Sequence, residues 1–272
     1  MEARLQRRVQ RYGWDRAAPH YEASWKAQLA PAQALLLEKA ALRRGEWVLD
    51  VACGTGLVTF PAAEAVGPEG CVAATDLSDA MVVHVRAEAE RRGLRHVAAE
   101  QCDSEEIAYP DGAFDAALCA LGMMYFPDPV ASMRAQHRAL RPGGRAVAAV
   151  WGQRDRCGWA GVFPVVEARV ASDVCPLFFA LGTGDTLRAT FEEAGFTDVT
   201  ATRIATTLHY PSAEAACAAA FVGGPVAMAY SRFDDETRAG AHVDYLATIE
   251  PYRSGEGYAI PGEFVVARGV RP

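Results

Sequence analysis

The chain has 272 residues, of which 51% are hydrophobic and 22% are charged. This balance is typical of a globular protein with one large domain, or with a domain and a subdomain. The formal net charge of −7 disfavours nucleic acid as a partner, because proteins that bind its phosphates are normally basic. No run of about 18 apolar residues occurs, and residues 1–15 lack the apolar core of a signal peptide. We therefore expect a cytoplasmic protein without a transmembrane helix.

Cysteine usage points to the same compartment. None of the seven cysteines forms a C-x-x-C pair, and several fall in apolar, strand-like runs. Such cysteines are typical of free, buried thiols in a reducing environment. We expect no structural zinc site. The cysteines are Cys53, Cys71, Cys102, Cys119, Cys157, Cys175 and Cys217.

The first 45 residues are expected to be helical, with breaks at Pro19 and Pro31 and a strong helix over residues 31–44. Strands and helices then alternate as far as residue 151. This alternation predicts a doubly wound α/β fold, with a mostly parallel sheet, helices on both faces and the loops that follow the strands on one edge. The expected strands are 47–52, 71–76, 96–101, 114–121 and 145–151, and the expected helices are 56–66, 78–92 and 128 to about 140–144.

The remainder of the chain has a different pattern. A helix is expected over residues 184–195, followed by a β-rich run to residue 210 and an alanine-rich helical stretch over 211–250. The run PGEFVVARGV at 261–270 predicts a last strand, which could pair with the β-rich run as a hairpin. We therefore divide the chain into an N-terminal helical segment (1–44), an α/β core (45–210 and 259–272) and a helical insert (211–258).

The stretch WVLDVACGTGL at 47–57 carries the main functional signal. A strand that runs into a glycine loop lets the backbone approach a ligand closely. A dinucleotide fingerprint counted from Gly54 requires a third glycine at position 59, where Thr59 stands, and Asp50 would repel a pyrophosphate. S-adenosylmethionine has no phosphate, and a carboxylate can face its cationic end directly or through water. Asp50 therefore favours S-adenosylmethionine over NAD.

A second acid, Asp76, ends the next strand. A carboxylate at this place accepts hydrogen bonds from the ribose hydroxyls of an adenosine ligand, although it does so for NAD as well. Leu77 and Met81 follow it and could pack against the adenine.

Taken together, these residues resemble class I S-adenosylmethionine-dependent methyltransferases, and most of all the small-molecule group around the ubiquinone/menaquinone-biosynthesis C-methyltransferases. The resemblance covers roughly residues 45–151. Four segments carry it: LDVACGTG (49–56), ATDLSDAM (74–81), QCDSEEIAYPDGAFDAAL (101–118) and LRPGG (140–144).

The resemblance implies a seven-stranded sheet whose last strand is antiparallel, S-adenosylmethionine as cofactor and S-adenosylhomocysteine as product. It places Asp103 and the Ser104 backbone at the adenine, and residues 119–121 at the methionine end. Ala52 stands where the family has its first loop glycine, and its methyl group fits if φ is negative there. The implied cofactor residues are Tyr21, Asp50, Ala52, Gly54, Gly56, Asp76, Leu77, Met81, Asp103, Ser104, Cys119 and Ala120.

The acceptor is less well defined. Met124, Tyr125 and Trp151, with Trp159 and Phe178, indicate either core packing or an apolar acceptor pocket covered by the 211–258 insert. Tyr21, on the N-terminal segment, is expected to close over the cofactor. No residue stands out as a general base, and His209 and His20 are weak candidates.

The predicted activity is methyl transfer to a small, partly apolar metabolite without a metal, with carbon, oxygen, nitrogen and sulfur acceptors all open. Two alternatives remain at this stage: an NAD(P)-linked oxidoreductase, and a non-catalytic protein that binds S-adenosylmethionine. The sequence leaves the oligomeric state undetermined, with a homodimer as one option.

Overall fold

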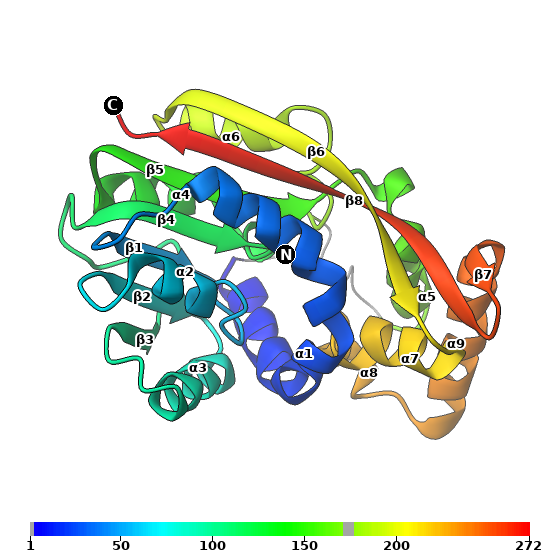
Figure 1. The fold of residues 1–272 in the computed structure, drawn as a ribbon. Coiled ribbons are helices and arrows are strands. Elements are labelled where there is room, and N and C mark those ends of the chain that lie inside the picture. Colours follow the sequence, from blue (N-terminus) through cyan, green and yellow to red (C-terminus); the bar gives the residue numbers. More distant parts are fainter. Residues whose placement is uncertain (1–2, 171–176) are drawn as a thin grey trace.

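A computed structural model describes residues 3–170 and 177–272. Its centre is one sheet in the order β3-β2-β1-β4-β5-β8-β6, with the short β7 paired to β8 (Figure 1). The first five strands are parallel, and β8 runs antiparallel to both of its long neighbours. The strands are β1 (Trp47–Val51), β2 (Cys71–Asp76), β3 (Val97–Gln101), β4 (Phe114–Ala120), β5 (Leu140–Trp151), β6 (Thr197–Tyr210), β7 (Arg253–Ser254) and β8 (Gly257–Val270).

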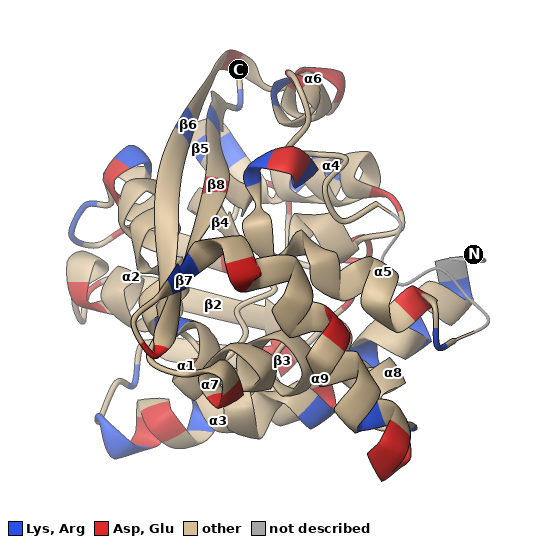
Figure 2. Ribbon diagram, turned by 90° about the vertical axis from the view of Figure 1, so that its right-hand side faces the viewer, with Lys and Arg blue, Asp and Glu red and all other residues tan. Residues whose placement is uncertain are grey.

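Helices cover both faces of the sheet, with α2 and α4 on opposite sides (Figure 2). The central strands are mostly apolar, as expected where both faces of a sheet are buried, and Leu49, Leu118 and Val147 are completely inaccessible. The predicted α/β class and antiparallel last strand are confirmed. The helices are α1 (Ala3–Ala40), α2 (Thr59–Val66), α3 (Asp79–Arg91), α4 (Pro129–Ala139), α5 (Val162–Glu167), α6 (Thr186–Glu193), α7 (Ala213–Cys217), α8 (Ala227–Tyr230) and α9 (Asp235–Ile249).

The two strands predicted to form a hairpin do pair, from Thr197 opposite Val270 to Tyr210 opposite Tyr258. The chain between them forms α7, a π-helical turn at Ala218–Val222, α8 and α9. These helices lie at the end of the sheet where the β6–β8 ribbon extends beyond it, next to α1 (Figure 1).

The N-terminal helix corrects one expectation. Pro19 and Pro31 do not break it, and α1 is continuous over 38 residues. A proline inside a helix removes one backbone hydrogen bond and bends the axis, and α1 follows a bent course around the molecule (Figure 1).

The end of α1 also differs from its predicted limit at residue 44. The helix ends at Ala40, and Ala41 takes a positive φ of 45°. The guanidinium of Arg145 donates to the carbonyls of Ala40 and Ala41 and forms a buried ion pair with Glu46, with Nη2 2.7 Å from Oε2. A distant strand residue therefore satisfies the last carbonyls of α1.

Two further boundaries shift. The α4 helix ends at Ala139, and the segment LRPGG belongs to β5, which starts at Leu140 opposite Phe114 and has an irregular register next to that pair. The second helix begins at Thr59 because residues 54–57 form the turns of the glycine loop.

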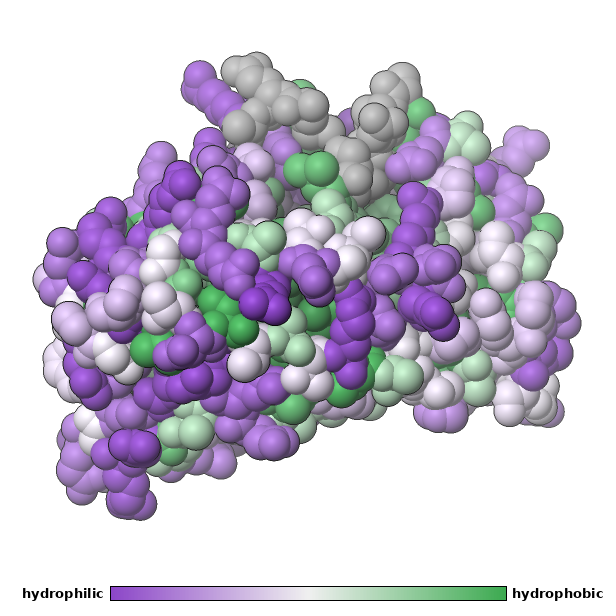
Figure 3. Space-filling view, turned by 90° about the horizontal axis from the view of Figure 1, so that it is seen from above, coloured by the Kyte–Doolittle hydropathy of each residue, from purple (hydrophilic) through white to green (hydrophobic). Residues whose placement is uncertain are grey.

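The state of the described cysteines and the character of the surface can be compared with what the sequence predicts. The six described cysteines are free, and Cys175 lies outside the described residues. Within residues 3–170 and 177–272, no helix is long and apolar enough to cross a membrane. From above, most of the surface is hydrophilic, with hydrophobic side chains gathered toward the middle (Figure 3).

Candidate functional site

A cavity lies at the carboxyl ends of β1, β2, β4 and β5, beside the first half of α1. Parallel α/β sheets bind ligands at this edge. Nine of the residues predicted for the cofactor line the cavity, whereas Asp50, Gly56 and Cys119 do not. The nine are Tyr21, Ala52, Gly54, Asp76, Leu77, Met81, Asp103, Ser104 and Ala120.

Asp76 is held by the backbone. The Gly54 N–H donates to its Oδ2 at 2.9 Å, and the Ser78 N–H donates to its Oδ1 at 2.8 Å. Burial raises the pKa of this carboxyl to about 6, although these hydrogen bonds act in the opposite direction. A carboxylate offers about four acceptor sites in all, so Asp76 keeps acceptor capacity beyond its backbone donors, which are Gly54, Ser78 and Leu77. Asp76 is therefore fixed in place and can still accept from a ligand.

Asp50 lies outside the cavity lining. Its side chain is 1% exposed, and the Thr59 hydroxyl donates to its Oδ2 at 2.6 Å. Burial, followed by the charge of Asp76, raises the pKa of Asp50 to about 7, against the effect of the Thr59 hydrogen bond. The threonine that breaks the dinucleotide fingerprint thus binds the acid at the end of β1. Asp50 therefore does not contact a ligand in the cavity directly. An attraction between the Asp50 carboxylate and the cationic end of the ligand over a longer distance stays a prediction.

The backbone has a positive φ at two neighbouring non-glycine residues of the cavity lining. Ala52 has φ of 56° and Leu121 has φ of 62°, in the left-handed region that costs a non-glycine residue about 1–2 kcal/mol. The expectation of a negative φ at Ala52 is therefore wrong. Its methyl group is accommodated because Gly122 faces it: a Cβ built on Gly122 would overlap the Ala52 Cβ.

The first half of α1 is fastened to the rim of the cavity. Arg7 Nε lies 2.6 Å from Asp103 Oδ2, and Arg7 also pairs with Glu105. Further along the helix, the Ser78 hydroxyl donates to Asp15 Oδ1 at 2.6 Å. These contacts hold α1 against the loops after β2 and β3, so that α1 forms one wall of the cavity.

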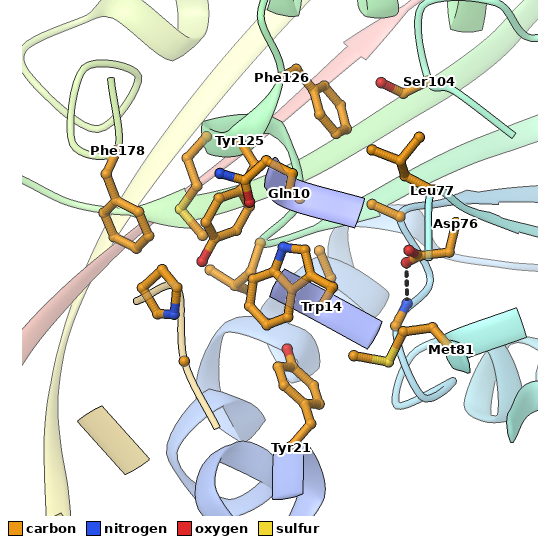
Figure 4. A pocket seen from close by; sticks show the side chains of 18 of the residues that line it. Gln10, Trp14, Tyr21, Asp76, Leu77, Met81, Ser104, Tyr125, Phe126 and Phe178 are labelled. Carbon is orange, nitrogen blue, oxygen red and sulfur yellow. Dashed lines mark hydrogen bonds between the residues drawn. The ribbon is translucent and has the colours of Figure 1, made fainter. Parts of the chain in front are cut away.

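The cavity has a polar side and an aromatic side. Asp76, Leu77, Met81 and Ser104 lie on one side of Trp14, and Tyr125 and Phe178 on the other (Figure 4). The Trp14 ring contacts Tyr21 and Tyr125 edge-on, with centroids 5.7 and 5.1 Å apart. The aromatic side also includes Trp25, Trp151 and Trp159.

The residues predicted for the acceptor are brought to this side, since Met124, Tyr125 and Trp151 all line the cavity. The two histidines proposed as weak candidates for a base, His20 and His209, do not line the cavity. His20 and His209 have exposed side chains, and the His209 backbone bonds the Gln28 side chain, so neither is placed to act as a base. Among the described residues, no group of three or more His, Cys, Asp or Glu could hold a metal ion.

Sequence reasoning missed Arg7, Gln10, Trp14, Leu29 and Pro225 as lining residues. The local sequence of α1 gives no motif for these positions. The one available signal was the density of aromatic and arginine side chains before residue 26.

Comparison with known proteins agrees with this geometry. Residues 48–144 match the family described as "Methyltransferase domain". Nocamycin O-methyltransferase from Saccharothrix syringae is 40% identical over 132 residues, which are 48% of this chain and 47% of that protein. Demethylmenaquinone methyltransferase from Geobacillus stearothermophilus is 33% identical over 112 residues, 41% of this chain and 48% of that protein. The matches thus span about half the length of these relatives.

The fold has solved counterparts as well. A putative methyltransferase from Bacillus halodurans superposes with a TM-score of 0.59 at 22% identity, covering 88% of this chain and 98% of that one. At this identity the likeness concerns the fold. The sequence match, which contains the glycine loop, Asp76 and Asp103, makes residues 48–144 similar to the methyltransferase-domain family.

Proposed function

We propose that this protein is an S-adenosylmethionine-dependent methyltransferase whose acceptor is a small, partly apolar metabolite. The observation that carries the proposal is Asp76: a buried carboxylate, oriented by backbone N–H groups, that lines the cavity and keeps acceptor capacity for a ligand. It lies in a cavity whose other side is aromatic, and within a methyltransferase domain.

The polar side of the cavity fits the proposed cofactor. Asp76 can accept from two ribose hydroxyls, while the apolar side chains of Leu77 and Met81 suit an adenine ring. Asp103 is already paired with Arg7, so we assign the adenine contact to the Ser104 backbone at least as much as to the Asp103 carboxylate. Gly54 presents no side chain between the loop and the ligand.

When bound, the cofactor supplies an activated methyl group on a sulfonium. The remaining task of the chain is to align the acceptor with that methyl group and to keep water away. Trp14 and Tyr21, from the segment 1–44, cover the polar side. Gly224 and Pro225, from the insert 211–258, reach the cavity lining, and we assign this insert to the acceptor.

The first test is calorimetric titration with S-adenosylmethionine, S-adenosylhomocysteine and NAD. We expect binding of the first two and none of NAD. Asp76→Ala should weaken binding by about 1–3 kcal/mol, since hydrogen bonds to a charged group are lost. Asp79→Ala, at an exposed acid three residues further on, is the matched control and should bind normally. Binding of NAD alone would refute the proposal.

Turnover needs a second test, because cofactor binding alone is also what a non-catalytic protein would show. The names of the two relatives suggest an acceptor panel that includes nocamycin-type and naphthoquinone-type compounds. Formation of S-adenosylhomocysteine that depends on an added acceptor would support the enzyme. Tight cofactor binding with no turnover across a broad panel would favour the non-catalytic alternative.

A further inference from the structure

The two halves of α1 are anchored in different ways. The second half is held by burial, since Trp25, Leu29 and Leu36 are at most 5% exposed. Among residues 4–16, by contrast, no residue is buried. Pro19 lies between the halves and cannot donate a backbone hydrogen bond to the preceding turn. Segments with little burial open locally at a small cost in free energy. Residues 3–18, which we call the strap, can therefore move without the rest of α1.

Polar contacts fasten the strap at two points. At the first, Arg7 forms ion pairs with Asp103, with 2.6 Å between Nε and Oδ2, and with Glu105. These three side chains are 29%, 17% and 10% exposed, so the charges are only partly screened by water and salt. At the second point, Asp15 Oδ1 accepts a hydrogen bond from the Ser78 hydroxyl at 2.6 Å. Charge and hydrogen bonding, rather than burial, thus keep the strap in place.

Both fastening points lie on loops that surround the polar side of the cavity. The Ser78 N–H donates to Asp76 Oδ1 at 2.8 Å, and the Glu105 N–H donates to Asp103 Oδ1 at 3.0 Å. Asp76 and Asp103 line the cavity, and between the two fastening points the strap directs Trp14 into it (Figure 4). A ligand on the polar side is therefore covered by a segment that is tied to the loops around that ligand.

We propose that the strap is a gate, which opens at Pro19 to admit and release the cofactor, and that the ion pairs of Arg7 with Asp103 and Glu105 are its latch. This inference rests on the proposed methyltransferase function for the identity of the ligand. Glu105 lies outside the cavity lining, so its effect on a ligand must pass through Arg7 and the strap. Glu105 is thus a positioning residue.

A gate leaves a kinetic signature. The latch joins groups of the protein to one another, so it has to open for entry of the ligand as well as for its exit. As long as the closed form dominates, a weaker latch raises the association and dissociation rate constants by the same factor and leaves the dissociation constant almost unchanged. A residue that only held the ligand would change mainly the dissociation rate constant.

Stopped-flow tryptophan fluorescence, with Trp14 in the strap as a reporter, measures both rate constants for S-adenosylhomocysteine. We expect Glu105→Gln to raise both by roughly fivefold, because it loses the charge opposite Arg7. The new amide keeps an oxygen for the Asp128 N–H, which donates to Glu105 Oε1 at 3.0 Å. Arg8→Gln, at the exposed arginine next to Arg7, is the matched control and should leave both rate constants unchanged.

Salt provides an independent handle on the latch. Added NaCl screens ion pairs, so it should raise both rate constants in the wild-type protein. In Arg7→Gln, which lacks both ion pairs, salt should have much less effect. An equal response to salt in the two proteins would contradict the latch.

Hydrogen exchange followed by mass spectrometry tests the strap without any ligand. Amides of residues 4–16 should exchange roughly fivefold faster in Glu105→Gln than in the wild type, whereas unchanged exchange of residues 25–40 shows that the variant is folded. Equal exchange of residues 4–16 in the two proteins would overturn the inference, as would a change in the dissociation rate constant alone or the same effect in Arg8→Gln. Failure of S-adenosylhomocysteine to bind, with the expected faster exchange, would instead refute the proposed function and support the mobile strap.

Discussion

Asp76 should link cofactor affinity to pH. Its ionised form accepts the ribose hydroxyls, while burial raises its pKa in the free protein to about 6. Binding must therefore expel the proton below pH 6, and affinity is lost as the pH falls through that value. At pH 5 about one molecule in eleven is ionised, so the dissociation constant for S-adenosylhomocysteine should rise about elevenfold over its value at pH 8, or about 1.4 kcal/mol.

Calorimetry at several pH values, in buffers of different ionisation enthalpy, measures both the affinity and the protons released. We expect release of about one proton for each S-adenosylhomocysteine bound at pH 5 and of none at pH 8. Asp50 also titrates in this range, with a pKa of about 7. The experiment is therefore repeated in Asp50→Asn, which removes that second titration and should preserve the loss of affinity below pH 6.

Asp76→Asn, made in the Asp50→Asn background so that this second carboxyl does not titrate, is the decisive variant. Its amide cannot take up a proton, so binding should be weaker at every pH but should no longer depend on pH between 5 and 8. A wild-type dissociation constant that stays constant over this range would refute the reasoning, as would a pH dependence that survives in Asp76→Asn. Either result would mean that the ribose does not use the Asp76 carboxylate.

Three further predictions concern stability, measured by urea unfolding. Burial raises the pKa of Asp50 above its value in the unfolded chain, so the free energy of unfolding falls as the pH rises from about 4 to 7 and Asp50 ionises. Asp50→Asn removes this loss. It should therefore raise the free energy of unfolding by at most about 4 kcal/mol at pH 8 and by almost nothing at pH 4. Gly122→Ala should lower the free energy of unfolding by about 1–3 kcal/mol, because the new methyl group overlaps that of Ala52. Adding Ala52→Gly should restore most of this stability. If the effects of the two substitutions simply add, the two residues are not in contact. Arg145→Met should cost about 3–5 kcal/mol because the Glu46 carboxylate is left buried without its cation. The double variant Arg145→Met/Glu46→Leu should recover stability. If Arg145→Met alone is as stable as the wild type, the ion pair is not buried in solution.

The polar side of the cavity could be read from the sequence because its signals are local. Asp76 is the last residue of β2 and Gly54 lies in the loop after β1, and hydrophobic runs locate those strands to within a residue or two. Parallel strands then bring their carboxyl ends to one edge. Segments far apart in the chain thus meet at a place that topology alone determines.

The N-terminal helix could not be predicted in the same way. Proline statistics favour a break at Pro19 and Pro31, yet α1 runs through both positions. Arg7 meets Asp103 and Asp15 meets Ser78, and no local pattern specifies either pairing. The cavity wall built from α1 therefore depends on contacts that only the folded chain defines.

Ala52 shows why a motif compared letter by letter can mislead. The loop has a positive φ at Ala52, a conformation for which a glycine is usual. The methyl group of Ala52 needs space, and Gly122, in the loop after the neighbouring strand β4, leaves that space open. The loop can hold an alanine at position 52 only because position 122 is a glycine, so the two residues have to be judged together. A departure from a family motif is therefore better judged by what its side chain would touch than by its identity, and at Ala52 the folded chain supplies the compensation.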